Sequence, residues 1–335
     1  MLITLIVPFY NEEQHLSRSI RSIQQQTFAD YEVLLVDDLS TDGSYALAER
    51  LTHGDERFRL IQNEQKGLFH ARNKALAEAR GEYICFLDAD DELLPDYLSE
   101  LYIDIQQTDA DLVVQGFTRI RKDRQEVMSV YTPGFFDLIE SAQAAFSSFD
   151  VSCLSNVFAK LYRRSIILDH HLLFSPHVYM CEDMYFVVSY VSFCRNLLLS
   201  SANNYHYIAH GESMSTRYWD YETERQSFFE LRKVWDRLFS TNPCPALQAS
   251  FGSFYGPYLH RLVFSGLTHP ISKKYQKQNI VEIECRFLDE YALNYQPWTK
   301  FTRSLKWVIV HRHFRLYLLL VRLAFIRYGI TVRYV

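Results

Sequence analysis

Two clusters of acidic residues in the first hundred positions have side chains and spacing that could bind a metal ion. Asp37-Asp38 follows the apolar run 32–36, and Asp88-Ala89-Asp90-Asp91 follows the apolar run 83–87. Mg²⁺ and Mn²⁺ prefer hard oxygen ligands, and they are typically shared between one or two carboxylates and substrate phosphates. The alternative for an isolated D-x-D sequence is an acidic cap that stabilises the next helix.

The elements that must position these clusters alternate between short apolar runs and helical spacing. The runs that predict buried strands are 2–7, 32–36, 57–61 and 83–87, and the helical patterns are 12–26, 44–51, 71–79 and a helix with Pro95 in its first turn. Continuous apolar strands that alternate with helices predict an α/β fold with a parallel sheet covered on both faces. Because ligands bind beyond the carboxyl ends of parallel strands, the acidic clusters should meet at one edge of that sheet.

Several function classes lack their signature in this sequence. Neither G-x-G-x-x-G nor GxxxxGK[ST] is present, so the dinucleotide-binding and P-loop classes lack their phosphate cradle. A net charge of −5 and a pI of about 6.2 do not indicate a nucleic-acid binder. The six cysteines are scattered without a CxxC pair, which favours reduced thiols in a cytoplasmic protein over a zinc site.

Four motifs, in order along the chain, together resemble those of family 2 glycosyltransferases. They are Val7-Pro8-Phe9-Tyr10-Asn11-Glu12, Val36-Asp37-Asp38-Leu39-Ser40-Thr41-Asp42-Gly43-Ser44, Ala71-Arg72-Asn73 and Phe86-Leu87-Asp88-Ala89-Asp90-Asp91. Two later segments, 159–164 and Cys181-Glu182-Asp183, resemble further motifs of that family. The resemblance covers residues 1–216 and implies a GT-A-type fold, with a mostly parallel sheet flanked by helices, and transfer with inversion at the anomeric carbon. The Gln-x-x-Arg-Trp motif of the processive synthases is absent, so we expect addition of a single sugar.

The same resemblance implies a role for nine residues. Asp183 is the expected general base, Asp90 and Asp88 are the expected ligands of Mg²⁺ or Mn²⁺, and the expected nucleotide-sugar contacts are Pro8, Tyr10, Glu12, Asp38, Lys66, Arg72 and Asp88. Displacing a nucleoside diphosphate requires a group that takes the proton of the attacking hydroxyl, and a carboxylate can do this.

Some of these residues have a structural alternative. Asp183 could cap the apolar helix that it begins, and Arg72 could be an ordinary solvated helix residue. Asn73 could bond the backbone of a neighbouring loop. Leu39 stands where the family usually has glycine, and His210 lies in a loop where relatives often carry arginine, so it could supply a cationic contact or be a surface residue.

The second part of the chain, residues 217–335, has helical spacing and a basic end. Residues 291–335 contain eight Lys or Arg and no Asp or Glu, so this segment carries a charge of +8. Because the net charge of the whole chain is −5, the remaining residues carry −13. Its longest apolar stretch is much shorter than the roughly 20 residues that span a bilayer. We expect residues 298–334 to lie on an anionic membrane surface as a basic amphipathic segment. The alternative is a terminal helix packed on the acidic catalytic domain.

These features predict a metal-dependent, inverting hexosyl- or N-acetylhexosaminyltransferase at the cytoplasmic face of the membrane. The expected donor is a UDP-sugar, and the expected acceptor is a glycan or lipid-linked hydroxyl in cell-surface polysaccharide assembly. A nucleotidyltransferase is one rival, but it should carry a Gly- and Arg/Lys-rich loop where this chain has Pro8-Phe9-Tyr10-Asn11. A non-catalytic sugar-nucleotide-binding module is the other, and the presence of Asp88, Asp90 and Asp183 argues against it.

Overall fold

The computed structural model describes the chain except residues 122–123, 129–130, 150, 210–218, 269–272, 297–299 and 329–335. The chain divides into two compact units. The first comprises Met1–Pro176, Cys181–His210 and Val234–Leu247, and the second His177–Met180, Gly211–Lys233 and Gln248–Val335. The domain boundary expected at 216/217 falls among residues 210–218, outside the described residues, and stays a prediction.

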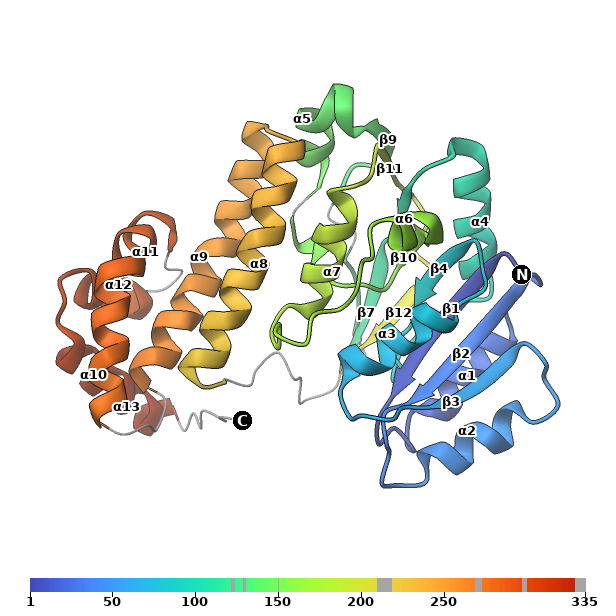
Figure 1. The fold of residues 1–335 in the computed structure, drawn as a ribbon, viewed down its shortest axis with the longest axis horizontal. Coiled ribbons are helices and arrows are strands. Elements are labelled where there is room, and N and C mark those ends of the chain that lie inside the picture. The colour runs from blue at the N-terminus through green and yellow to red at the C-terminus, as the bar shows by residue number, and fades with distance from the viewer. Residues whose placement is uncertain are drawn as a thin grey trace. The chain divides into compact units, whose positions relative to one another are not determined.

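An eight-stranded sheet forms the centre of the first unit (Figure 1). Its strands are β1 (Ile3–Phe9), β2 (Tyr31–Asp37), β3 (Phe58–Gln62), β4 (Tyr83–Phe86), β6 (Leu112–Val114), β9 (Gly134–Asp137), β10 (Lys160–Arg163) and β11 (Asn196–Leu199). They lie in the order β3-β2-β1-β4-β10-β6-β11-β9. The first four of that order are parallel, β10 is antiparallel to both of its neighbours, and β6 and β11 are again parallel. The predicted α/β fold with a mostly parallel sheet is confirmed.

A second, four-stranded sheet has the order β5-β12-β7-β8. Its strands are β5 (Glu92–Leu93), β7 (Phe117–Arg121), β8 (Arg124–Val127) and β12 (Tyr205–Ile208). β7 and β8 pair antiparallel, with Thr118 opposite Val127 and Arg121 opposite Arg124. β9, β11 and β12 are each four residues long, which is too short for a hydrophobic period to predict them from the sequence.

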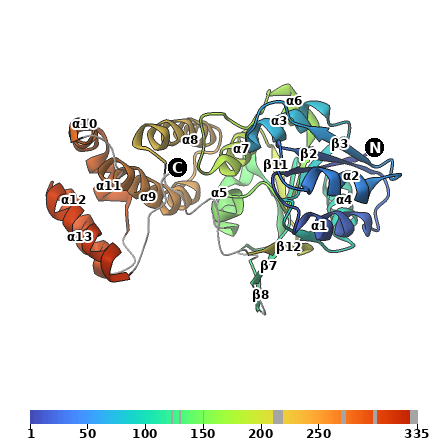
Figure 2. The same ribbon diagram turned by 90° about the horizontal axis from the view of Figure 1, so that it is seen from below.

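Helices cover both faces of the large sheet (Figure 2). α1 (Leu16–Gln24), α2 (Ser44–Thr52) and α4 (Tyr97–Thr108) lie on one face, and α3 (Leu68–Glu78) and α6 (Arg164–Asp169) lie on the other. The first unit also contains α5 (Leu138–Ser148), the 3₁₀ helix η1 (Val151–Leu154) and α7 (Glu182–Val191).

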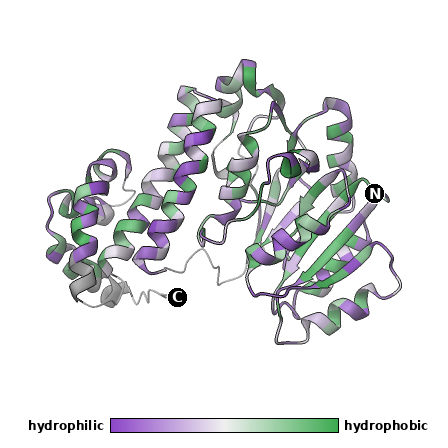
Figure 3. Cartoon of the chain, viewed as in Figure 1, coloured by the Kyte–Doolittle hydropathy of each residue, from purple (hydrophilic) through white to green (hydrophobic). Residues whose placement is uncertain are grey.

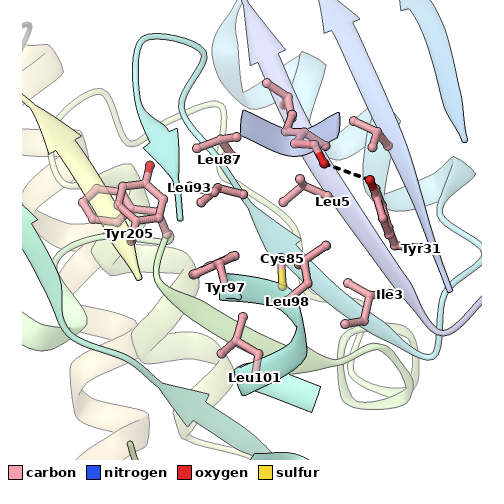
Figure 4. Packing of buried hydrophobic residues seen from close by; sticks show 14 of the residues in the cluster. Ile3, Leu5, Tyr31, Cys85, Leu87, Leu93, Tyr97, Leu98, Leu101 and Tyr205 are labelled. Atoms are coloured by element: carbon pink, nitrogen blue, oxygen red, sulfur yellow. Dashed lines mark hydrogen bonds between the residues drawn. The ribbon is translucent and has the colours of Figure 1, made fainter. Parts of the chain in front are cut away.

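The core beneath α1, α2 and α4 is built from alternate strand residues (Figure 4). Ile3, Leu5 and Cys85 are fully buried there, and they pack with Leu98 and Leu101 of α4. Colouring by hydropathy shows the same pattern, with predominantly hydrophobic strands inside the sheet (Figure 3). Because both faces of the parallel strands are covered, their side chains are apolar in continuous runs and not in alternation.

The predicted place of Pro95 is wrong. α4 begins at Tyr97, after Asp96, so Pro95 precedes the helix and does not lie in its first turn. The Tyr97 amide donates to the Leu94 carbonyl oxygen at 3.1 Å, and the Pro95 carbonyl oxygen accepts from the Thr27 amide at 2.9 Å. Pro95 therefore belongs to a turn that is bonded to the loop after α1.

The C-terminal region is helical, as predicted. Its elements are α8 (Tyr221–Thr241), α9 (Pro245–Thr268), α10 (Lys273–Glu282), the π-helix η3 (Ile283–Phe287), α11 (Leu288–Asn294), α12 (Lys300–Val310) and α13 (Phe314–Tyr328). Four residues of α8 with helical spacing are all buried, namely Phe228, Leu231, Trp235 and Leu238. Among the described residues, no helix combines the length and apolar character required to cross a membrane.

Candidate active site

The loops after β1 and β2 are hydrogen-bonded to each other at the carboxyl edge of the sheet. The Asn11 side-chain oxygen accepts from the Thr41 amide at 2.8 Å, and the Asn11 amide donates to Ser40 Oγ at 3.1 Å. Asn11 and Leu39 both have a left-handed backbone, with φ of 55° and 61°. Leu39 thus keeps the conformation that glycine favours although it is not glycine, at a cost of roughly 1–2 kcal/mol in backbone strain.

Asp38 connects this edge to the start of α3. Its side chain is buried, and Oδ1 accepts from Asn63 Nδ2 and from the Gly67 amide, both at 2.8 Å. Gly67 has φ of 142° and immediately precedes α3. Asp38 therefore holds the turn from which α3 begins.

Lys66 and Tyr10 lie together in the same region. Lys66 Nζ is 3.8 Å from the centroid of the Tyr10 ring, a cation–π contact. Glu12 Oε2 accepts from His15 Nδ1 at 2.9 Å, and Pro8 lies inside β1 opposite Val36. Of these expected nucleotide contacts, Tyr10 and Glu12 therefore follow β1, Pro8 lies within β1, and Lys66 reaches Tyr10 from the loop between β3 and α3.

Arg72 is the centre of a buried ionic cluster. Its side chain is 3% exposed, so the solvated alternative is wrong. Nη1 donates to Asp183 Oδ1 at 2.6 Å and to Glu182 Oε1 at 3.0 Å, and Nη2 donates to Asp88 Oδ1 at 3.5 Å. The guanidinium lies 5.0 Å from the ring centroid of Phe174. Through Arg72, α3 is therefore connected both to the loop after β4 and to the start of α7.

The cluster carries more negative than positive charge. Burial disfavours the charged form of Arg72, but Asp183, Glu182 and Asp88 outweigh it and raise the pKa of the guanidinium. Burial, with the nearby Asp183 and Asp90, raises the pKa of Asp88 to about 7 although Arg72 opposes this shift. Burial also raises the pKa of Glu182 to about 7, with further contributions from Asp183 and Asp88. A positive ligand would relieve this repulsion.

Asp183 is held through both of its carboxylate oxygens. Oδ1 binds Arg72, and Oδ2 accepts from the Val157 amide at 3.2 Å. α7 begins at Glu182 after Cys181, which is left-handed with φ of 59°, so Asp183 lies in the first turn and not at the cap position. Its side chain is 20% exposed. Each oxygen retains a lone pair beyond the bond described, so the carboxylate can still accept a proton.

The loop that contains the D-x-D sequence is held by Tyr205 of β12. The Tyr205 hydroxyl donates to Asp91 Oδ2 at 2.6 Å and accepts from the Asp88 amide at 3.3 Å. Asp91 Oδ1 accepts from the Ile208 amide at 2.8 Å, and Arg18 donates to the Asp90 carbonyl oxygen. Sequence reasoning missed Tyr205, because it lies in a strand of four residues with no motif of its own.

The acidic loop has the donor set that Mg²⁺ or Mn²⁺ prefers. Asp88 and Asp90 are only partly buried, whereas the carboxylate of Asp91 is buried and bonded within the protein. Among the described residues, no three His, Cys, Asp or Glu side chains form a metal-binding group by themselves. Two carboxylates completed by phosphate oxygens and water are the usual environment of Mg²⁺. These residues therefore fit a cation that binds together with a diphosphate.

Two other expectations concern Asn73 and His210. Asn73 exchanges two hydrogen bonds with the backbone of Phe174, at 2.9 Å and 2.8 Å, so its predicted structural role is confirmed. His210 lies outside the described residues.

Comparisons with known proteins agree with this architecture. Residues 4–170 match the family model described as glycosyl transferase family 2. The putative glycosyltransferase EpsH of Bacillus subtilis is 31% identical over 221 residues, which are 64% of this chain and 63% of that protein. The chain therefore spans less than two thirds of the length of this relative. The poly(ribitol-phosphate) beta-N-acetylglucosaminyltransferase TarP of Staphylococcus aureus is 23% identical over 295 residues, 86% of this chain and 84% of that protein.

A solved structure shows the same fold. The crystal structure of S. aureus TarS 1–349 in complex with UDP-GlcNAc aligns with a TM-score of 0.67 and 21% identity, over 99% of this chain and 93% of that one. The predicted GT-A-type fold is confirmed by this similarity together with the strand order. Residues 4–170 match the family model, and this part of the chain is a glycosyl transferase family 2 domain.

Proposed function

We propose that this protein is a metal-dependent, inverting glycosyltransferase that moves one sugar from a nucleotide-diphosphate sugar, a UDP-sugar in our proposal, to a hydroxyl group. The acceptor is a glycan or lipid-linked molecule in cell-surface polysaccharide assembly. The names of TarP and of the TarS complex support a UDP-GlcNAc donor and a polymer acceptor.

One observation carries the proposal. Arg72 contacts both the first carboxylate of the D-x-D sequence and Asp183, at 3.5 Å and 2.6 Å. A donor whose diphosphate lies beside Asp88 would therefore have its sugar on the side of the cluster where Asp183, a candidate base, lies. Bringing a leaving group and a proton acceptor to one small region is what a displacement reaction requires.

The site residues have three roles in the proposed reaction: binding the nucleotide, holding the cation and accepting the proton. In this proposal the nucleotide is contacted by Pro8, Tyr10, Glu12, Asp38 and Lys66. Asp88 and Asp90 would hold a divalent cation, which stabilises negative charge on a departing diphosphate when it is bound. Asp183 takes the proton of the acceptor hydroxyl as it attacks. Attack from the face opposite the leaving group inverts the anomeric centre.

Turnover of a panel of sugar nucleotides tests this function. We expect release of nucleoside diphosphate from UDP-Glc, UDP-GlcNAc or UDP-Gal in the presence of Mg²⁺ or Mn²⁺, and much slower release from GDP-Man. Release of pyrophosphate from a nucleoside triphosphate and a sugar phosphate would instead indicate a nucleotidyltransferase. Binding of UDP-sugars without any turnover, in the presence of acceptor extracts, would support the non-catalytic module.

We also propose that the end of the chain contacts an anionic membrane. On α13, Leu316, Leu319 and Leu323 are each 42–53% exposed and are spaced by three and four residues, so they share one helix face. Arg312 and Arg315 are exposed nearby, and Trp307 of α12 is 54% exposed. An exposed apolar row with cationic neighbours suits the boundary between lipid headgroups and acyl chains. The alternative of a fully packed terminal helix leaves this row unexplained.

Vesicle co-sedimentation tests the membrane proposal. The protein should sediment with anionic vesicles at low salt and less at high salt, because each Lys or Arg near the surface contributes about 1 kcal/mol that salt screens. Truncation before Trp298, or the triple change Leu316→Ser, Leu319→Ser and Leu323→Ser, should abolish sedimentation. Leu173→Ser removes an equally exposed leucine of the first unit and should have no effect. Equal recovery in the supernatant with anionic and neutral vesicles would refute membrane docking.

A further inference from the structure

Lys160 is a charged residue in the interior of the first unit. It lies in β10, the strand between β4 and β6, and only 1% of its surface is exposed. Nζ donates to the Asn156 carbonyl oxygen at 2.8 Å, to Asn156 Oδ1 at 2.6 Å and to the Phe158 carbonyl oxygen at 3.3 Å. All three acceptors are uncharged. Burying an ammonium with such partners is costly, and the three bonds tie β10 to residues 156–158.

The segment that Lys160 binds also holds Asp183. The Val157 amide, between the two residues that Lys160 contacts, donates to Asp183 Oδ2 at 3.2 Å. Tyr162, two residues along β10 and on the same face, donates from its hydroxyl to the Val157 carbonyl oxygen at 2.9 Å. Both side chains of β10 are therefore bonded to the short segment 156–158, and that segment is bonded to the carboxylate.

We propose that Lys160 is a positioning residue for the reaction: it fixes segment 156–158 so that the Val157 amide orients Asp183 Oδ2 toward the acceptor hydroxyl. This inference rests on the proposed role of Asp183 as the base. Arg72 holds the other oxygen, so without the Val157 contact the carboxylate could rotate about its bond to Arg72. A general base that is displaced by about 1 Å can lose on the order of 10²-fold in rate.

Lys160→Met tests the proposal, because methionine has a similar length but no donor. With the donor that the sugar-nucleotide panel identifies, we expect kcat to fall by about 10-fold to 10²-fold. KM for the donor and the affinity for UDP should stay within about threefold, since the contacts at the ends of β1, β2 and β4 are unchanged. In the Asp183→Asn background, Lys160→Met should lower kcat no further, because the oriented group is already lost.

Tyr162→Phe is a milder second variant in case Lys160→Met does not fold. It removes only the hydroxyl that bonds to Val157, and kcat should fall several-fold with UDP affinity retained. Tyr31→Phe is the control, because the Tyr31 hydroxyl also donates to a backbone carbonyl oxygen, that of Ile23, at 2.8 Å, and in addition accepts from Arg57 Nη1 at 2.6 Å. It should lower the melting temperature by at least as much as Tyr162→Phe and leave kcat unchanged.

The outcomes separate this inference from the proposed function. If Asp183→Asn turns over nearly normally, Asp183 is not the base and the proposed function is at fault. If Asp183→Asn is impaired while Lys160→Met and Tyr162→Phe keep their full kcat, the positioning role is wrong and the proposed function stands. If Lys160→Met lowers kcat as much in the Asp183→Asn background as it does alone, the positioning role is also wrong, because Lys160 then affects the rate independently of Asp183.

Discussion

Asp90→Ala is expected to abolish turnover, with kcat/KM reduced by about 10³-fold or more, since a cation in such a site supplies several kcal/mol of charge stabilisation. Binding of UDP should lose its dependence on Mn²⁺ or Mg²⁺, because one of the two proposed ligands is missing. The fold should survive. Asp90 contacts Arg18 through its backbone carbonyl oxygen, which alanine keeps, and its side chain lies at the sheet edge and not in the core.

The measurement is UDP affinity by calorimetry with and without Mn²⁺, together with nucleoside diphosphate release. Asp30→Ala is a suitable control, because Asp30 is an exposed carboxylate just before the first residue of β2, at the end of the strand away from the proposed site. It should behave as the unmodified protein does. Full activity of the unmodified protein in excess chelator would contradict the metal proposal directly.

Asp183→Asn is expected to lower kcat by about 10² or more while UDP affinity stays within a few-fold. Asparagine has nearly the same shape, and its amide oxygen can still accept from Arg72 or from the Val157 amide. It cannot take a proton from the acceptor. The loss should therefore appear in kcat, and binding of the donor should be preserved.

Glu182→Gln provides the matched control for this change. Glu182 is the adjacent carboxylate and also accepts from Arg72 Nη1, at 3.0 Å. Removing its charge perturbs the same ionic cluster without removing the proposed base, so kcat should fall much less than in Asp183→Asn. Equal losses in the two variants would mean that the charge balance around Arg72, and not proton transfer, limits the rate.

The first half of the fold could be predicted from the sequence because its signals are local. The runs that become β1, β2, β3 and β4 lie close to their predicted bounds. In β1, β2 and β4 every residue is buried, which leaves a continuous hydrophobic pattern, whereas β3 is an edge strand that is only partly buried. The helical patterns between them are equally local. The motifs follow these strands, so their gathering at one edge follows from parallel pairing alone. For the same reason the family resemblance could be stated from spacing in the sequence.

The arrangement within the site was decided only by the tertiary structure. Whether Arg72 is solvated or buried depends on residues 110 and 111 positions away in the chain, Glu182 and Asp183, which no local pattern connects to it. Likewise, Asp183 forms its bonds to Arg72 and Val157, although its position at the start of an apolar helix equally suited a cap. Tyr205 and Lys160 form their hydrogen bonds from strands of four residues each. The hydrophobic period of a segment predicts which of its side chains are buried. It does not predict the polar partners of a buried charge, because these come from segments that are distant in the sequence. A buried charge must be hydrogen-bonded, and only the packing of those segments decides which groups bond to it.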